Sequence, residues 1–469
     1  MRFNLNTRFV MWWSIAWALG LMAVAPIVNY FTPFLNSAYN NQWTPDVYWR
    51  LVLYWHGALF MPWVTVLACI ICTTFKLDTI KGTAYKLIRE SIMYGGFIAT
   101  PLAGIAGIFD VYDRFALGIP LWLQIIAFLI GDEMAIALIV TMFLYPKVSG
   151  VGYDKVGLAY YTVLAALIGV LIAAFEGHIG GWITWAGPWP SFVSNYINST
   201  MYSVLGYYNA TAVITWTENV VTSHSHTMIP LILAGIVALI SSIYGYNEMK
   251  GSAKLISAAG FFIMIYMIIA VVWLYIVAGV GNYSIPTLFA SGPNGVNGLA
   301  MDDTMTGMIG WGALLVLIGT GVYAHRQKKL DRSLLFILIA AALIYLTVPV
   351  TGYYIEFHES YFGFATPGQG PGWMYDAAYL RFHQDFGFFL LPMLITASLA
   401  FKYMGIEEKR KNLVNDLFTI GSIIAFIFGE SYVFTLNNVF LYLAFLGGAI
   451  TAVGVLTGLL STYKDVVLI

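Results

Sequence analysis

Twelve long apolar runs constrain this chain more than any other feature. A helix needs about 20 mostly apolar residues to cross the hydrocarbon core of a bilayer. The runs, numbered here as spans 1 to 12, lie near 9–30, 48–74, 91–109, 119–145, 157–177, 224–246, 254–280, 305–325, 333–354, 378–402, 413–432 and 436–461. We therefore predict an all-α membrane protein of twelve transmembrane helices, with residues 1–469 forming a single polytopic membrane domain.

The composition supports a lipid bilayer as the surrounding solvent. Of the 469 residues, 60% are hydrophobic and only 10% charged, and the mean hydropathy is +0.78. Soluble domains carry about 25% charged residues. Nucleic acid is excluded as a partner because 22 basic residues face 23 acidic ones. The two cysteines, Cys69 and Cys72, are too few for a disulfide scaffold, and Thr73 stands where a c-type haem motif needs histidine.

The basic residues predict the orientation. Nineteen of the 22 lie at the termini or after even-numbered spans, and only Arg50, Arg114 and Arg381 lie on the other face. By the positive-inside rule both termini are cytoplasmic. The Asn-x-Ser/Thr sequons all fall in predicted outer loops, which indicates a glycosylated outer face and an archaeal or eukaryotic host, with an archaeal plasma membrane favoured. These sequons are at Asn198, Asn209 and Asn282.

The histidines gather on one side of this topology. His325 lies at the inner end of span 8, and the other six map to the outer third of the protein. Histidine near a membrane interior is a functional-site hypothesis by default, and neutral imidazole is the commonest protein metal ligand. We therefore predict a haem or metal site formed by some of these residues: His56, His178, His224, His226, His358 and His383.

An internal repeat relates the histidines to one another. Span 5 ends in Glu176-Gly-His178 before the histidines of span 6, and span 9 ends in Glu356-Phe-His358 before His383 of span 10. Span 2 carries a weaker copy at His56. Spans 2, 6 and 10 thus each bring in a histidine from the outer end. The repeat predicts three four-helix units about a pseudo-threefold axis, approximately 1–150, 151–328 and 329–469.

This pattern resembles subunit I of the haem–copper oxidase superfamily. The stretch Tyr54-Trp-His-Gly-Ala-Leu-Phe-Met-Pro62 is similar to that family's second helix, His226 with Pro230 to its sixth, and Arg381-Phe-His-Gln-Asp385 to its tenth. The resemblance implies a low-spin haem b bound by His56 and His383. It departs from the family in span 7, which has no histidine for copper, and in span 10, which has one histidine where two are required.

Two arginines fit the same haem. A bis-histidine haem needs two imidazoles at similar depth and cations for its propionates, and Arg50 and Arg381 lie on the outer side of His56 and His383. Anchoring of helix ends at the interface is the alternative interpretation. The remaining cluster is predicted to hold a second haem, a copper or another metal, or else to cap the first haem through hydrogen bonds. Its members are Glu176, His178, His224, His226, Glu356 and His358.

One acidic pair lies deep within span 4. Carboxylates in lipid are costly and often mark proton paths. Asp132 and Glu133 are therefore predicted to belong to a proton path, with a protonated structural pair as the alternative.

The sequence favours a haem-b respiratory subunit that moves electrons between quinol and an outer-face acceptor or partner subunit. Such a partner would be a cytochrome, a copper protein or an iron–sulfur protein. One alternative is a terminal oxidase or nitric-oxide-reductase-like subunit with an unorthodox second metal site. Another is a twelve-span metal transporter, although transporters usually show two six-helix halves and a midplane site.

Overall fold

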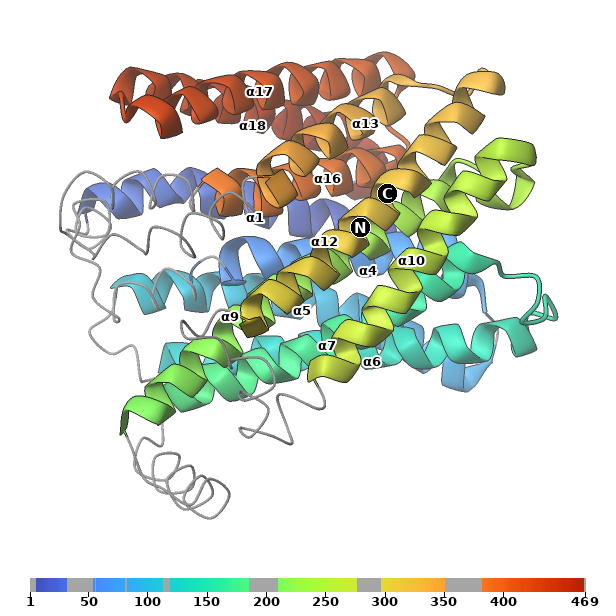
Figure 1. Cartoon of the computed structure of the whole chain (residues 1–469), viewed down its shortest axis with the longest axis horizontal. Coiled ribbons are helices and arrows are strands. Elements are labelled where there is room, and N and C mark those ends of the chain that lie inside the picture. The colour runs from blue at the N-terminus through green and yellow to red at the C-terminus, as the bar shows by residue number, and fades with distance from the viewer. Residues whose placement is uncertain are drawn as a thin grey trace. The chain divides into compact units, whose positions relative to one another are not determined.

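The computed structural model describes residues 6–31, 54, 56–80, 82–112, 119–184, 210–275, 297–350 and 382–467. These residues form helices joined by turns, with no strand among them (Figure 1). The chain divides into two compact units. One is discontinuous and comprises Met1–Val148 with Gln327–Ile469, and the other, the middle unit, comprises Ser149–Arg326.

The described residues of the middle unit form four α-helices. α7 packs against α9, α10 packs against α12, and α9 contacts α12. Glycines allow these backbones to approach closely, as is usual in membranes. A Cβ on Gly312 would lie 2.8 Å from the carbonyl oxygen of Gly260. The helices are α7 (Leu158–Thr184), α9 (Ala210–Ile243), α10 (Gly251–Tyr275) and α12 (Asn297–Arg326).

The discontinuous unit surrounds a central helix, α4. This helix contacts α1, α5, α6 and α16, and its Trp63, Cys69 and Ile70 are buried. The outermost pair, α17 and α18, run side by side (Figure 1). The helices are α1 (Thr7–Phe31), α4 (Met61–Thr74), α5 (Thr83–Tyr112), α6 (Ile119–Val148), α13 (Arg332–Tyr345), α16 (Leu391–Met404), α17 (Glu408–Thr435) and α18 (Asn438–Val467).

The apolar helices confirm the predicted class of an all-α membrane protein. Across the described ranges, ten helices are long and apolar enough to cross a membrane, and all ten coincide with predicted spans. Two shorter apolar helices, Thr227–Ile243 and Arg332–Val348, coincide with predicted spans 6 and 9. Exposed apolar side chains such as Phe262, Ile269 and Leu460 suit contact with lipid. Twelve spans, three four-helix units and cytoplasmic termini stay predictions.

Three π-helical turns lie among the described residues of the discontinuous unit. They are η1 (His56–Phe60), η5 (Leu346–Val350) and η6 (Phe382–Leu390). η1 leads into α4 and η6 into α16, and a proline, Pro62 or Pro392, stands in the first turn of each following helix. Because proline lacks an N–H and its ring crowds the preceding turn, the hydrogen-bond ladder is disturbed there. Such turns are frequent at functional sites.

Candidate haem site

His383 is held in one orientation by a backbone carbonyl. It lies in η6, is 9% exposed, and its Nδ1 atom is 2.9 Å from the carbonyl oxygen of Thr347 in η5. A carbonyl only accepts hydrogen bonds, so Nδ1 carries the proton and donates it. The lone pair of the imidazole is therefore on Nε2. The ring also contacts the edge of Phe388, with centroids 4.8 Å apart.

Close packing fixes the turn that carries His383. A Cβ on Gly387 would lie 2.7 Å from Oγ1 of Thr347, and a Cβ on Gly429 of α17 would overlap the ring of Phe382. The hydroxyl of Thr347 donates to the carbonyl oxygen of Leu343 at 2.8 Å. η6 is thus enclosed between η5 and α17 with little room to shift.

His56 begins the corresponding turn on α4. Its half-buried ring contacts Phe60 at 5.6 Å and the edge of Phe128 on α6 at 6.0 Å, measured between ring centroids. The next residue, Gly57, lies so close to α5 that a Cβ would overlap the carbonyl oxygen of Ala103. The position of His56 is therefore set by backbone contact with α5 and by an aromatic side chain of α6.

A hydrogen bond links the two helices that carry these histidines. Trp63 of α4 donates its Nε1–H to Oγ1 of Thr396 on α16 at 2.9 Å. His56 precedes Trp63 by seven residues, and His383 precedes Thr396 by thirteen. At a rise of 1.5 Å per residue, the two histidines differ in depth by about 9 Å. This offset departs from the similar depth expected of two imidazoles on one haem, so joint ligation by His56 and His383 stays a prediction.

The middle unit holds a second immobilised histidine. Nδ1 of His224 on α9 lies 2.6 Å from the carbonyl oxygen of Ala173 on α7. Its ring covers Gly177, where a Cβ would meet three ring atoms at 2.5–2.8 Å. His178 follows at the end of α7, and its ring contacts the edge of Phe175 at 6.4 Å. His224 of α9 thus contacts α7 close to His178.

Several predicted site residues have no described side chain. Glu176 and His226 lie in α7 and α9, but their side chains are not described. Because α9 is helical throughout, positions 224 and 226 are about 200° apart around its axis. The other predicted residues lie outside the described ranges: Arg50, Asn198, Asn209, Asn282, Glu356, His358 and Arg381.

Haem and isolated metal ions need different numbers of protein ligands. Among the described side chains, no group of three or more His, Cys, Asp or Glu residues could hold a metal ion. Zinc and copper sites usually need at least three protein ligands. Haem iron receives four nitrogens from its macrocycle and needs only one or two axial residues. Because the side chains of Glu176, His226, Glu356 and His358 are not described, this finding does not bear on the predicted second metal site.

The acidic pair of span 4 is divided between two environments. Asp132 on α6 is 8% exposed, whereas Glu133 is exposed and accepts a hydrogen bond from the hydroxyl of Ser91 on α5. Adjacent helical residues point about 100° apart, which accounts for the separation. Asp132 lies one turn beyond Phe128, the residue that contacts His56. Of the two carboxylates, Asp132 has the buried environment expected of a proton-path residue.

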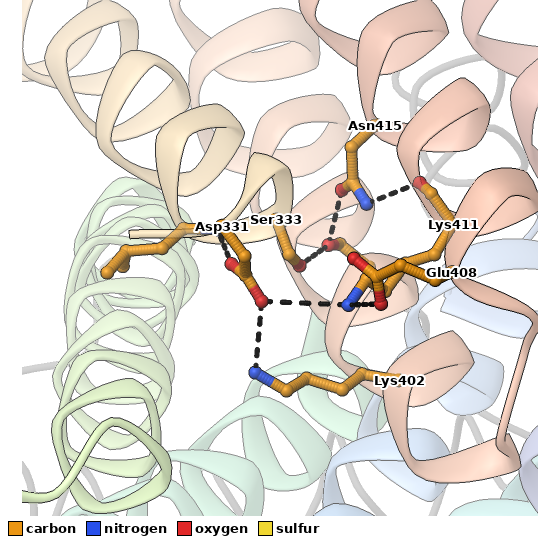
Figure 2. A network of polar contacts seen from close by, with 8 residues as sticks. Asp331, Ser333, Lys402, Glu408, Lys411 and Asn415 are labelled. Carbon is orange, nitrogen blue, oxygen red and sulfur yellow. Dashed lines mark hydrogen bonds and ion pairs between the residues drawn. The ribbon is translucent and has the colours of Figure 1, made fainter. Parts of the chain in front are cut away.

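A charged cluster at the other end of span 10 was not predicted. Asp331 caps α13 by accepting from the N–H of Leu334 at 2.8 Å, and its Oδ2 lies 3.4 Å from Nζ of Lys402 and 3.7 Å from Nζ of Lys411. Lys411 also pairs with Glu408 at 2.7 Å (Figure 2). The two carboxylates and two ammonium groups of this cluster give it a net charge of zero.

Neutral side chains continue the cluster into the core. Ser333, Ser398 and Asn415 come from α13, α16 and α17, and all three are buried. Ser398 donates to Oδ1 of Asn415 at 2.6 Å and is 2.5 Å from the hydroxyl of Ser333, while Asn415 donates to the carbonyl oxygen of Lys411 at 2.8 Å (Figure 2). The buried pair Phe336 and Phe418 lies next to it. The cluster fixes α16, the helix that η6 leads into.

Comparisons of the whole chain with protein-family models, with curated proteins and with solved structures give no match. The resemblance to the oxidase subunit therefore rests on the short histidine-containing stretches of spans 2, 6 and 10.

Proposed function

We propose that the protein is a haem-b-containing respiratory membrane subunit that transfers electrons between quinol and an outer-face acceptor or partner subunit. The observation that carries this proposal is the pair of histidines on neighbouring helices, each in a π-helical turn that precedes a proline. His383 offers a buried imidazole whose Nε2 lone pair is directed by the hydrogen bond at Nδ1.

The arrangement of His383 suits axial ligation for a chemical reason. Iron binds the unprotonated imidazole nitrogen, and a hydrogen bond from the other ring nitrogen to a carbonyl fixes the tautomer and raises ligand basicity. Thr347 supplies that carbonyl. A bound haem b would supply reversible one-electron transfer within the membrane.

The other residues have distinct roles in this proposal. His56 would be the second haem ligand, and the rings of Phe60 and Phe128 pack against it. Arg50 and Arg381 are proposed to neutralise the propionates, and Asp132 to exchange protons with the inner side. The same proposal places a glycosylated outer face at an archaeal plasma membrane, where a cytochrome, copper or iron–sulfur protein accepts electrons.

The test is optical spectroscopy of the purified full chain. We expect a low-spin α-band in the reduced-minus-oxidised spectrum and haem b by pyridine haemochrome. His383→Ala and His56→Ala should each abolish the α-band, whereas His325→Ala, at the exposed end of α12, should keep it. A wild-type chain without haem would contradict the proposal and favour the metal transporter. Cyanide-sensitive oxygen consumption with stoichiometric copper would favour the oxidase.

A further inference from the structure

One side of α17 carries a strip of side chains that stay exposed in the structure. The apolar members of this α17 strip are between 37% and 64% exposed, namely Leu413, Ile420, Ile423, Ile427 and Phe434. From Ile420 onward the strip positions alternate in steps of three and four residues: 420, 423, 427, 430 and 434. This spacing is the a/d pattern by which one helix packs along another. The strip thus has the spacing needed for a further helix to pack along α17.

The α17 strip also includes a carboxylate, Glu430. It is partly exposed, lies within the membrane-spanning segment Glu408–Thr435, and makes no hydrogen bond or ion pair with any described residue. Charged groups within membrane spans are costly and almost always pair with another group. The other carboxylate of the strip follows this rule, because Asp416 lies 3.6 Å from Arg332 of α13. Glu430 is therefore a charge for which the described part of the chain supplies no counterion.

Packing on the core side of α17 keeps Glu430 on the strip. The preceding residue, Gly429, lies so close to η6 that a Cβ would overlap the ring of Phe382. Val433, three residues further on, is only 1% exposed. Within the described parts of α13, α16 and α18, the charged residues lie near the opposite end of the bundle; they are Arg332, Lys402, Lys464 and Asp465. A counterion for Glu430 must therefore come from outside these helices.

We propose that the α17 strip is the docking surface for a transmembrane helix of another subunit, and that this helix carries an arginine or lysine opposite Glu430. The apolar side chains supply van der Waals contact, and the single ion pair fixes the register of the two helices. A second copy of this chain fits less well, because two-fold contact between identical strips would bring two Glu430 carboxylates together at the same depth. The inference uses no histidine and does not depend on haem, so it goes beyond the proposed electron transfer.

The experiment measures binding of synthetic transmembrane peptides to the full chain in phosphatidylcholine nanodiscs. The probe is a leucine–alanine helix with one arginine five residues from its end, because Glu430 lies five residues before the end of α17 at Thr435. Matched peptides carry leucine or glutamate at that position. Förster transfer between labelled peptide and labelled chain reports association. We expect the wild type to bind the arginine peptide about tenfold more tightly than the leucine peptide, and the glutamate peptide most weakly.

Two pairs of variants separate the charge from the apolar surface. Glu430→Gln should lose the preference for arginine, whereas Asp416→Asn, whose carboxylate already pairs with Arg332, should keep it. Ile427→Ala should weaken binding of the arginine and leucine peptides alike. Leu460→Ala on α18, which is 68% exposed but outside the strip, should not.

Three results would overturn the inference. One is equal binding of the arginine and leucine peptides by the wild type, and another is an unchanged preference in Glu430→Gln. The third is self-association of the chain that Glu430→Gln abolishes, because it would assign the strip to a second copy. A wild-type chain that lacks haem but prefers the arginine peptide would contradict the proposed function and support this inference.

Discussion

The Nδ1 atom of His383 and the carbonyl oxygen of Thr347 are 2.9 Å apart, and this bond joins two π-helical turns on successive spans. The orientation of a predicted haem ligand therefore depends on the backbone of η5, not on a neighbouring side chain. No substitution of Thr347 removes its carbonyl group. The bond is best disturbed by changing the packing between η5 and η6.

Gly387→Ala should disturb that packing. The new methyl group would lie 2.6 Å from Cγ2 of Val348 and 2.7 Å from Oγ1 of Thr347, so η6 must move away from η5. Overpacking of this kind costs about 1–3 kcal/mol. We expect a lower melting temperature and a shifted or weakened low-spin α-band. Gly448→Ala on α18, where nothing lies within 4 Å, is the matched control. An α-band identical to wild type would show that the bond does not position the ligand.

Gly57→Ala should affect the other histidine. Its Cβ would overlap the backbone oxygen of Ala103, and a backbone atom cannot be relieved by a rotamer change. η1 must therefore shift relative to α5, which moves His56. We expect a loss of haem per chain, measured as pyridine haemochrome, at an unchanged amount of protein in the membrane. Gly20→Ala on α1 has open space and should retain its haem. Full haem content in Gly57→Ala would contradict the proposal that η1 positions His56 for haem binding.

The charged cluster gives a prediction about stability. Asp331→Ala removes both the cap of α13 and a partner of Lys411, whose side chain is only 11% exposed. Loss of the cap costs about 1 kcal/mol, and the disturbed ion pairs add to it, so we expect a total of about 2 kcal/mol. Asp331→Asn can still cap the helix and should lose about half as much.

The control for this stability measurement is Glu90→Ala. It removes a carboxylate at the surface of α5 that lies 3.6 Å from Nζ of Lys86 and 3.9 Å from Nη2 of Arg89, and should change the melting temperature little. Equal melting temperatures for Asp331→Ala and the wild type would contradict the view that the cluster fixes α16.

The helices were predictable because the bilayer leaves the chain few choices. A backbone in lipid must satisfy its own hydrogen bonds, so apolar runs become helices. The π-helical turns were not predicted, and the sequence signal that could have found them is the proline after each of η1 and η6, Pro62 and Pro392. The bond between His383 and Thr347 joins residues 36 positions apart, so it depends on tertiary packing that no local pattern specifies. From the sequence, Lys411 is only one of the basic residues that predict the orientation in the membrane. The burial of its side chain depends on the packing of α17 and cannot be read from the sequence.

Arg50 and Arg381 give a prediction on the haem potential. If they pair with the propionates, each positive charge stabilises the reduced haem, which carries one more negative charge than the oxidised form. Replacing either arginine by glutamine should therefore lower the midpoint potential while haem stays bound. Redox titration of the α-band measures this. An unchanged midpoint potential in both variants would favour the alternative interpretation, in which the arginines anchor the helix ends at the membrane interface.

The last prediction is that the protein does not reduce oxygen at a standard haem–copper centre. That chemistry needs copper held by three histidines, and in the similar family two of these come from span 7. The described part of that span is α10, which has no histidine, and two of its hydroxyl residues, Ser257 and Tyr266, are poorly placed to replace one. Ser257 is fully buried, and its hydroxyl donates a hydrogen bond to the sulfur of Met249 at 3.6 Å. Tyr266 is 68% exposed on the surface of α10, beside other exposed apolar residues such as Phe262 and Ile269.

Metal analysis together with oxygen consumption tests this prediction. We expect no stoichiometric copper and no cyanide-sensitive oxygen uptake with a quinol donor. Copper at one atom per chain with cyanide-sensitive turnover would contradict the prediction. It would require a copper site built from residues outside span 7.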